Sequence, residues 1–308
     1  YYFNESPEEF ITTHAQALDF HTGFNLVGGV DVDKQTRQRF TEKFRKPAFS
    51  NHIDALNKLQ PDIAIISVPI EFHQPVFEDV TSHFTPRMII MEKPLSYNIA
   101  EAKKIMDIGL SRNFPVAMNY FREYEPTYRE ISEKIKNGLL DFPLKIVAHY
   151  TKGFINNGSH FLQYISNFMG EFQGIDIISP GRLWVEKDPE PDLCIQFENG
   201  EAYFIAHEEE NFSLYEMDII GPNGKLSFSK LGSMIENYKV VDDHQFKGYR
   251  VLSETPERFY PDLKKYQLHV YDNIFNYFTG EEELHCDLRT LKQTVNIYEK
   301  LEKVLSSV

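Results

Sequence analysis

The sequence of 308 residues is poor in cysteine and contains no long apolar run. Cys194 and Cys286 are far apart and lack a CxxC spacing, so we predict neither a disulfide framework nor a metal site. No apolar stretch approaches the roughly 20 residues that cross a bilayer, and no basic and apolar signal peptide stands at the amino terminus. These absences favour a protein of the reducing cytoplasm that does not bind a membrane.

Basic charge is also scarce. Lys and Arg number 32 against 46 Asp and Glu, which gives a formal net charge of −14. Because a nucleic-acid-binding surface needs clustered Lys and Arg to neutralise phosphates, we exclude DNA and RNA as partners. The hydrophobic fraction of 42% is ordinary for a globular protein, and the length suggests about two domains.

The first 120 residues alternate short apolar runs with helical segments. Buried strands are expected over 24–30, 62–68, 88–91 and 115–119, and helices over 33–44, 53–59 and 75–83 and from Asn98. A capping box at residues 6–9 predicts one more helix, which runs to about Phe20. Such an alternation is typical of βαβ units and predicts an α/β domain of the Rossmann type, with a doubly wound parallel sheet.

After residue 120 most segments look like strands. They cover 145–150, 182–186, 193–198, 202–207, 215–220, 226–229 and 234–241, and helices are expected over 126–137, 160–168, 263–278 and 288–305. Asn199-Gly200 and Pro222-Asn223-Gly224 are turn signals, which favour hairpins. We therefore predict a Rossmann-type domain over 1–120 and an α+β domain with an open, mostly antiparallel sheet over 121–308, whose C-terminal helix could pack back on the first domain.

The apolar run 88–91 stops abruptly at Glu92-Lys93-Pro94. Proline cannot donate to a strand ladder, so Lys93 is expected at the carboxyl end of a parallel strand. In open α/β sheets the ligand crevice lies outside these ends, where a flexible cation can meet a ligand. A solvated loop lysine is the alternative interpretation.

No Gly-x-Gly-x-x-Gly run is present to let a dinucleotide pyrophosphate approach a helix amino terminus. Gly23, Gly28 and Gly29 have another spacing, yet Asp31 stands where an acid can bind a ribose. We therefore expect that a first strand and its glycine loop precede Tyr1, about 10 to 15 residues in all at usual strand and turn lengths.

These features together resemble the glucose–fructose oxidoreductase/inositol dehydrogenase (Gfo/Idh/MocA) family. The resemblance is carried by the Rossmann-type half with Glu92-Lys93-Pro94, by the run Asn-Asn-Gly-Ser-His at 156–160 that opens a helix, and by the antiparallel sheet. Asp31, Pro69 with His73, and the run Asn-Tyr-Phe-Arg at 119–122 also fall where the family has recurring residues. The resemblance implies hydride transfer between a nicotinamide and a hydroxyl-bearing carbon of a sugar, a cyclitol or a nucleotide sugar.

The same resemblance implies that Lys93 stabilises a developing alkoxide and that His160 exchanges the proton, with the two side chains converging from different domains. Family members often carry an aspartate where this chain has Asn156, and an acid where it has Gln163. An amide can orient an imidazole but cannot stabilise imidazolium as a carboxylate does. The alternative for His160 is a histidine that merely bonds a neighbour in the first helical turn.

For the cofactor we expect NAD rather than NADP, because a carboxylate at Asp31 accepts bonds from both ribose hydroxyls and repels a 2′-phosphate. Asp31 could instead cap a helix, as could Asp33. The resemblance places Glu92 beside the nicotinamide ribose. It also implies that the cofactor crevice is lined by residues after the 62–68 strand, which are Pro69, Glu71 and His73.

For the substrate the candidates are Arg122, Tyr124 and Lys152, since a cation there could hold a phosphate or a carboxylate. The Asn-Gly-Ser-His run resembles branches of the family whose members act in sugar or nucleotide-sugar metabolism for surface polysaccharides, and this resemblance implies a similar substrate. The alternating runs 193–198 and 202–207 predict a sheet with one apolar face, which in this family commonly packs on another subunit, so a homodimer or homotetramer is expected. The absent glycine loop, Asn156 and Gln163 leave a second hypothesis, a catalytically silent homologue that binds a sugar ligand or a protein partner.

Overall fold

The computed structural model describes residues 10–185 and 187–306 and divides them into two compact units. Unit 1 runs to Tyr124 and also includes residues 264–289, whereas unit 2 comprises residues 125–263 and the remainder from Thr290. The segment 264–289 thus belongs to unit 1, although it follows most of unit 2 along the chain. The prediction placed one boundary at residue 120 and named the C-terminal helix as the segment that could pack back on the first domain.

Parallel strands organise unit 1. The strands β3 (Ile63–Ile66), β4 (Met88–Met91) and β5 (Val116–Met118) form one parallel sheet, and β1 (Gly29–Val30) pairs in parallel with β2 (Ala48–Phe49) in a separate one. Every residue of β4 is buried, as expected for a parallel strand that is covered on both faces. The predicted Rossmann-type architecture is confirmed.

Local signals in the sequence account for most helices of unit 1. Asp33, Asn51 and Asn98 accept backbone hydrogen bonds as N-caps of the helices that follow them. These helices are α2 (Lys34–Phe44), α3 (His52–Leu59) and α5 (Ile99–Leu110), while α4 (His73–His83) follows a 3₁₀ turn. The helix α8 (Tyr266–Thr279) contacts α1 (His14–Phe20).

Two expectations for the start of the chain are corrected. The box predicted at residues 6–9 lies outside the described residues, and among the residues from 10 onward the first helix begins at His14, where Thr13 and Gln16 form a capping box. Only the last two residues of the predicted 24–30 strand pair, as β1. Phe24 instead packs against the rings of Tyr271 and Phe275 on α8, at centroid distances of 5.4 and 6.2 Å.

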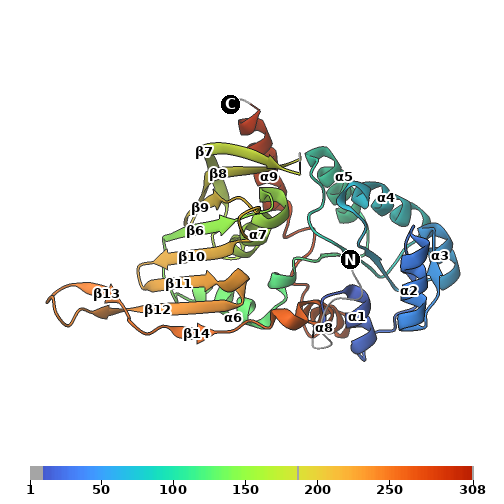
Figure 1. Cartoon of the computed structure of the whole chain (residues 1–308), viewed down its shortest axis with the longest axis horizontal. Helices are drawn as coiled ribbons and strands as arrows, with labels where there is room; N and C mark the ends of the chain where they lie inside the picture. The colour runs from blue at the N-terminus through green and yellow to red at the C-terminus, as the bar shows by residue number, and fades with distance from the viewer. Residues whose placement is uncertain (1–9, 186, 307–308) are drawn as a thin grey trace. The chain divides into compact units, whose positions relative to one another are not determined.

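A single nine-stranded sheet dominates unit 2 (Figure 1). Its path is β13-β12-β11-β10-β6-β9-β8-β7, with β14 also paired to β12; all neighbours are antiparallel except β6 and β9. The strands are β6 (Leu144–Tyr150), β7 (Phe172–Trp184), β8 (Asp188–Phe197), β9 (Gly200–Ala206), β10 (Tyr215–Gly221), β11 (Gly224–Ser229), β12 (Met234–Asp242), β13 (Arg250–Leu252) and β14 (Glu257–Phe259). The predicted mostly antiparallel sheet is confirmed.

Within the described residues of unit 2 the α-helices are α6 (Pro126–Lys136), α7 (Ser159–Ser166) and α9 (Lys292–Leu305). α9 contacts both α7 and β7, so it buries its apolar stripe within its own unit. The sequence predicted a shorter β7 and neither β13 nor β14, because these strands expose most of their residues and show no clear apolar alternation. None of the helices within residues 10–185 and 187–306 is long and apolar enough to cross a membrane.

Candidate functional site

In unit 1 the predicted site residues lie at the carboxyl ends of the parallel strands. Glu92 follows β4 and donates its backbone N–H to Ile66 O of β3 at 3.0 Å, and Asn119 follows β5 and donates to Met91 O of β4 at 2.8 Å. These bonds hold the three strand ends side by side. In a parallel sheet this edge faces the ligand crevice.

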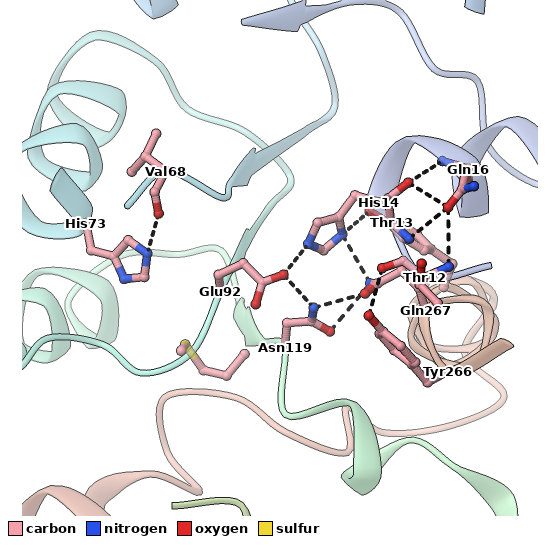
Figure 2. Close-up of polar contacts among 12 residues, drawn as sticks. Thr12, Thr13, His14, Gln16, Val68, His73, Glu92, Asn119, Tyr266 and Gln267 are labelled. Atoms are coloured by element: carbon pink, nitrogen blue, oxygen red, sulfur yellow. Dashed lines mark hydrogen bonds and ion pairs between the residues drawn. The ribbon is translucent and has the colours of Figure 1, made fainter. Parts of the chain in front are cut away.

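The Glu92 carboxylate belongs to a polar network of side chains, shown in Figure 2. Its Oε1 accepts a hydrogen bond from Asn119 Nδ2 at 2.8 Å and lies 3.1 Å from His14 Nε2. Because a carboxylate only accepts, Nε2 of His14 is the donor. His14 Nδ1 then accepts from the Tyr271 hydroxyl at 2.8 Å and from Gln267 Nε2 at 3.1 Å.

Sequence reasoning missed two members of this network. It gave no functional role to His14 or to Gln267, which accepts from Asn119 Nδ2 at 3.0 Å. His14 is 78 positions from Glu92, and Gln267 is 148 positions from Asn119. No local pattern could have joined them, since α1 and α8 bring these side chains in from both ends of the chain.

The network decides the charge of Glu92. Burial by itself would raise the pKa of this carboxyl group, but the hydrogen bonds from His14 and Asn119 and the positive charge of Lys93 outweigh burial, and the pKa of Glu92 is lowered. Burial raises the pKa of Tyr266 to about 12, and the negative charge of Glu92 adds to that rise. At neutral pH the site therefore presents a carboxylate among hydrogen-bond donors.

We expect Glu92→Gln to lower the free energy of unfolding by about 1.5–3 kcal/mol at pH 7, since it removes a partly buried, charge-assisted acceptor. The lowered pKa of Glu92 means that this stabilisation is present above its ordinary value of 4.5 and is lost as the pH falls through the folded-state value. Denaturant unfolding from pH 7 to pH 3 measures the difference between variant and wild type, with the exposed Glu281→Gln as control. A difference that stays constant over this range would contradict the role of the charge.

Lys93 is partly buried and is followed by buried Pro94 and Leu95. The ring of His73 faces this loop, because Nδ1 lies 3.0 Å from Pro94 O and 3.2 Å from Leu95 O, while Nε2 lies 3.1 Å from Val68 O. His73 is 1% exposed, and burial lowers its pKa. A neutral imidazole carries one N–H, so His73 donates to one side only, either to Val68 at the end of β3 or to the loop after Lys93. Pro69 and Glu71 are exposed beside it.

The structure separates the roles of the two aspartates after β1. Asp33 is the N-cap of α2, where it accepts from Thr36 N at 2.7 Å. Asp31 accepts from Asp33 N at 2.7 Å through Oδ1, and its Oδ2 makes no hydrogen bond within the described part of the chain. An acid with an available oxygen after a parallel strand fits a dinucleotide ribose. The guanidinium of Arg37 donates to Asp31 O at 2.8 Å, so a cation lies at the same turn.

Two of the proposed substrate residues belong to unit 1. Tyr124 is 2% exposed and its hydroxyl donates to the carbonyls of Met118 and Cys286 at 3.0 and 2.9 Å; burial raises its pKa well above the ordinary range. These contacts give Tyr124 a structural role at the end of β5. Arg122 is also buried, with its guanidinium 4.6 Å from the centre of the Phe121 ring.

In unit 2 the segment 154–158 forms a single π-helical turn, η3 (Phe154–Gly158), which continues directly into α7. His160 lies in the first turn of α7, is 4% exposed and meets Tyr215 edge to face at a centroid distance of 6.4 Å. Phe161 stacks on the same tyrosine at 3.7 Å. The position of His160 is thus fixed by aromatic packing against β10.

The neighbours of His160 are held by hydrogen bonds within unit 2. The side chain of Asn156 donates from Nδ2 to Lys152 O at 3.0 Å, and the backbone carbonyl of Asn156 accepts from Ser159 Oγ at 3.1 Å. Lys152 Nζ lies 2.9 Å from Glu209 Oε1. Gln163 donates to Thr290 Oγ1 at 3.3 Å and accepts from Thr294 Oγ1 at 3.1 Å, so it ties α7 to α9.

Comparison with known proteins gives one family match. Residues 9–120 match the model of the Gfo/Idh/MocA group, described as an oxidoreductase family with an NAD-binding Rossmann fold. Over 133 residues the chain is 26% identical to the inositol 2-dehydrogenase/D-chiro-inositol 3-dehydrogenase of Lacticaseibacillus casei. That match spans 42% of this chain and 38% of the relative, which is well under two thirds of the relative's length.

Similar solved structures cover nearly the whole chain. The WlbA dehydrogenase from Bordetella pertussis, in complex with NADH and UDP-GlcNAcA, superposes with a TM-score of 0.76 at 14% identity, covering 95% of this chain and 91% of that one. An NAD binding oxidoreductase from Klebsiella pneumoniae gives a TM-score of 0.77 at 13% identity, with coverages of 96% and 93%. At such identities the likeness concerns the fold, and it confirms a Rossmann-type half followed by an open antiparallel sheet.

Proposed function

We propose, from the membership of residues 9–120 in the Gfo/Idh/MocA oxidoreductase family, that this chain is an NAD-dependent dehydrogenase or reductase of a sugar or nucleotide sugar. The family match confirms the resemblance predicted from the sequence, and with it NAD as the class of cofactor. The observation that carries the proposal is that candidate site residues each follow the carboxyl end of a parallel strand, Asp31 in the β1–β2 pair and Pro69, Lys93 and Asn119 in the β3–β4–β5 sheet. The carboxyl ends of parallel strands are where such folds bind dinucleotides.

NAD supplies or accepts the hydride when it is bound, and the residues of the protein bind the cofactor, stabilise charge and exchange the proton. Asp31 would accept hydrogen bonds from the adenosine ribose, and Pro69 and Glu71 would line the crevice. His73 would fill the space between the end of β3 and the Lys93 loop, since its ring nitrogens face the protein's own carbonyls. Glu92, fixed by His14 and Asn119, would accept a hydrogen bond from the nicotinamide ribose.

In the proposed reaction Lys93 stabilises negative charge on the substrate oxygen, and His160 takes the hydroxyl proton in oxidation or returns it in reduction. Asn156 is proposed to keep the turn before His160 in place through its bond to Lys152 O. Arg122 and Lys152 stay as proposed contacts for an anionic part of the substrate. The buried hydroxyl of Tyr124 is engaged by two carbonyls, so we propose no direct substrate contact for it.

A nucleotide sugar is the substrate class that we favour, and such a substrate fits a place in surface-polysaccharide biosynthesis. Its support is a structural relative, the WlbA dehydrogenase, whose crystal structure is a complex with NADH and UDP-GlcNAcA together. We also propose a homodimer or homotetramer that uses the face of the unit 2 sheet where Val147, Tyr203 and Ile205 are partly exposed. The cysteine content keeps the reducing cytoplasm as the proposed compartment.

Titration with NADH, followed by nicotinamide fluorescence, tests the proposal. We expect saturable binding that is weakened by Asp31→Ala, and tighter binding of NADH than of NADPH because the Asp31 carboxylate repels a 2′-phosphate. Glu281→Gln, exposed elsewhere in unit 1, serves as the control variant. A panel of sugars and nucleotide sugars with NAD then identifies the substrate.

The second candidate function is a catalytically silent homologue that binds a sugar or a protein partner, and Asn156 in place of an acid is the observation that favours it. Sugar binding without any NADH binding at millimolar cofactor would support this candidate and overturn the dehydrogenase.

A further inference from the structure

The turn that precedes His160 is anchored by buried acids from another strand. Asp188 and Glu190, which we call the acidic clamp, are alternate residues at the start of β8 and are 0% and 2% exposed. Both side chains accept hydrogen bonds from backbone amides of the segment 153–156. The sequence marks these acids only as Asp-Pro-Glu-Pro at 188–191, which gives no hint of their partners.

Asp188 makes the closest contacts. Its Oδ1 accepts from Ile155 N at 2.8 Å, and its Oδ2 accepts from Asn156 N at 2.7 Å. The two oxygens thus satisfy two consecutive amides of η3, which is the pattern of a charge-assisted cap. Because Asp188 is fully buried, an interaction with these amides is worth more than the same contact would be in water.

Glu190 reinforces the same segment. Its Oε1 accepts from Gly153 N at 3.0 Å, and its Oε2 accepts from Arg182 Nε at 2.7 Å. Arg182 stands opposite Glu190 in the β7–β8 ladder and also binds Glu210. Glu190 is therefore held by the neighbouring strand β7 as well as by the turn.

Gly153 is the residue that allows this approach. Its φ is +80°, and a Cβ built there would lie 2.0 Å from Asp188 Oδ2. Any side chain at 153 would push the carboxylate away from the amides of Ile155 and Asn156. The hydrogen bonds that Asp188 accepts from Ile155 and Asn156 thus depend on glycine at position 153.

We propose that Asp188 is a positioning residue, which sets the orientation of Asn156 and, through the direct junction of η3 with α7, the place of His160. The inference rests on the proposed function for its catalytic consequence, whereas its structural part stands on the contacts alone. Asp188 touches backbone amides of the turn and acts on the reaction only through the residues that the turn carries.

The test compares Asp188→Asn with Asp192→Asn. Asp192 lies on the same strand and accepts from Ala206 N at 2.9 Å, so its variant loses a similar bond that does not involve the turn. In D188N an amide NH₂ group faces one of the two N–H donors. We expect hydrogen exchange at the Ile155 and Asn156 amides to become about 10-fold faster, and kcat to fall about 10- to 100-fold with the Kd for NADH unchanged. D192N should change none of these three quantities.

Gly153→Ala displaces the same carboxylate while Asp188 remains, and it serves if D188N does not fold. Its control is Gly138→Ala, where φ is +89° but no atom lies within 4 Å of the added Cβ. Unchanged exchange at Ile155 and Asn156 in D188N or G153A would overturn the clamp, and faster exchange with unchanged kcat would overturn its positioning role. If wild type binds no NADH, the proposed function fails while the exchange result still decides the clamp.

Discussion

Lys93→Ala is expected to lower kcat by about 10²–10³-fold, the effect of removing one preorganised stabiliser of a developing oxyanion. Lys93 is the second residue after β4, in a loop where Nδ1 of His73 lies 3.0 Å from Pro94 O and 3.2 Å from Leu95 O. The cofactor contacts that we propose for Asp31 and Glu92 do not require the ammonium group. The Kd for NADH should therefore stay within about twofold of wild type, a shift well below the 1.4 kcal/mol that a tenfold change represents.

The matched control is Lys104→Ala, which removes an exposed lysine of the same unit that pairs with Glu78 on α4. Steady-state kinetics and NADH fluorescence measure both variants. Turnover of Lys93→Ala at the wild-type rate would contradict the role assigned to this residue. A large rise in the Kd for NADH with kcat unchanged would instead make Lys93 a cofactor ligand only.

His160→Asn is expected to lower kcat by about 10²–10⁴-fold, the usual contribution of a general acid or base. Asparagine retains a polar side chain but cannot exchange a proton near neutral pH. The pH profile of kcat should also lose the limb that reports the imidazole. His149→Asn is the control in unit 2, because His149 is a partly buried histidine on β6 whose Nδ1 lies 3.0 Å from His207 Nε2.

If the pH profile of kcat in His160→Asn keeps the limb assigned to the imidazole, His160 is excluded as the proton carrier. The double variant Lys93→Ala with His160→Asn gives a further check. If both residues serve the same chemical step, the double variant should lose about as much as the more damaged single variant, since residues that act as a unit are strongly non-additive. Fully additive losses would assign the two residues to different steps.

Local patterns were sufficient for much of the fold. Asp33 and Asn98 stand at N-caps where the sequence predicts helix starts, and Gly138 follows α6 with a positive φ as a carboxyl-terminal glycine should. The apolar run before Glu92 is the fully buried strand that it resembles. These features depend on neighbouring residues only, and this is why a single sequence can reveal them.

The same patterns misplaced elements whose partners are distant. The apolar residues from Phe24 look like a strand, but the ring of Phe24 packs on α8, and only Gly29–Val30 pairs with β2. Hydrophobicity predicted the burial in this case, but not the partner. Strands β13 and β14 were not predicted, because they are short and mostly exposed and so show little hydrophobic periodicity.

By itself the sequence determined the fold class, the family resemblance and the choice of Lys93 and His160 as candidate catalytic residues, because strand patterns, caps and short motifs are local. The tertiary structure decided which side chains surround them. His14 and Gln267 reach Glu92 and Asn119 from opposite ends of the chain, and Asp188 reaches the turn before His160 from β8. Buried polar groups must find partners wherever the fold supplies them, and those partners have no required spacing in sequence.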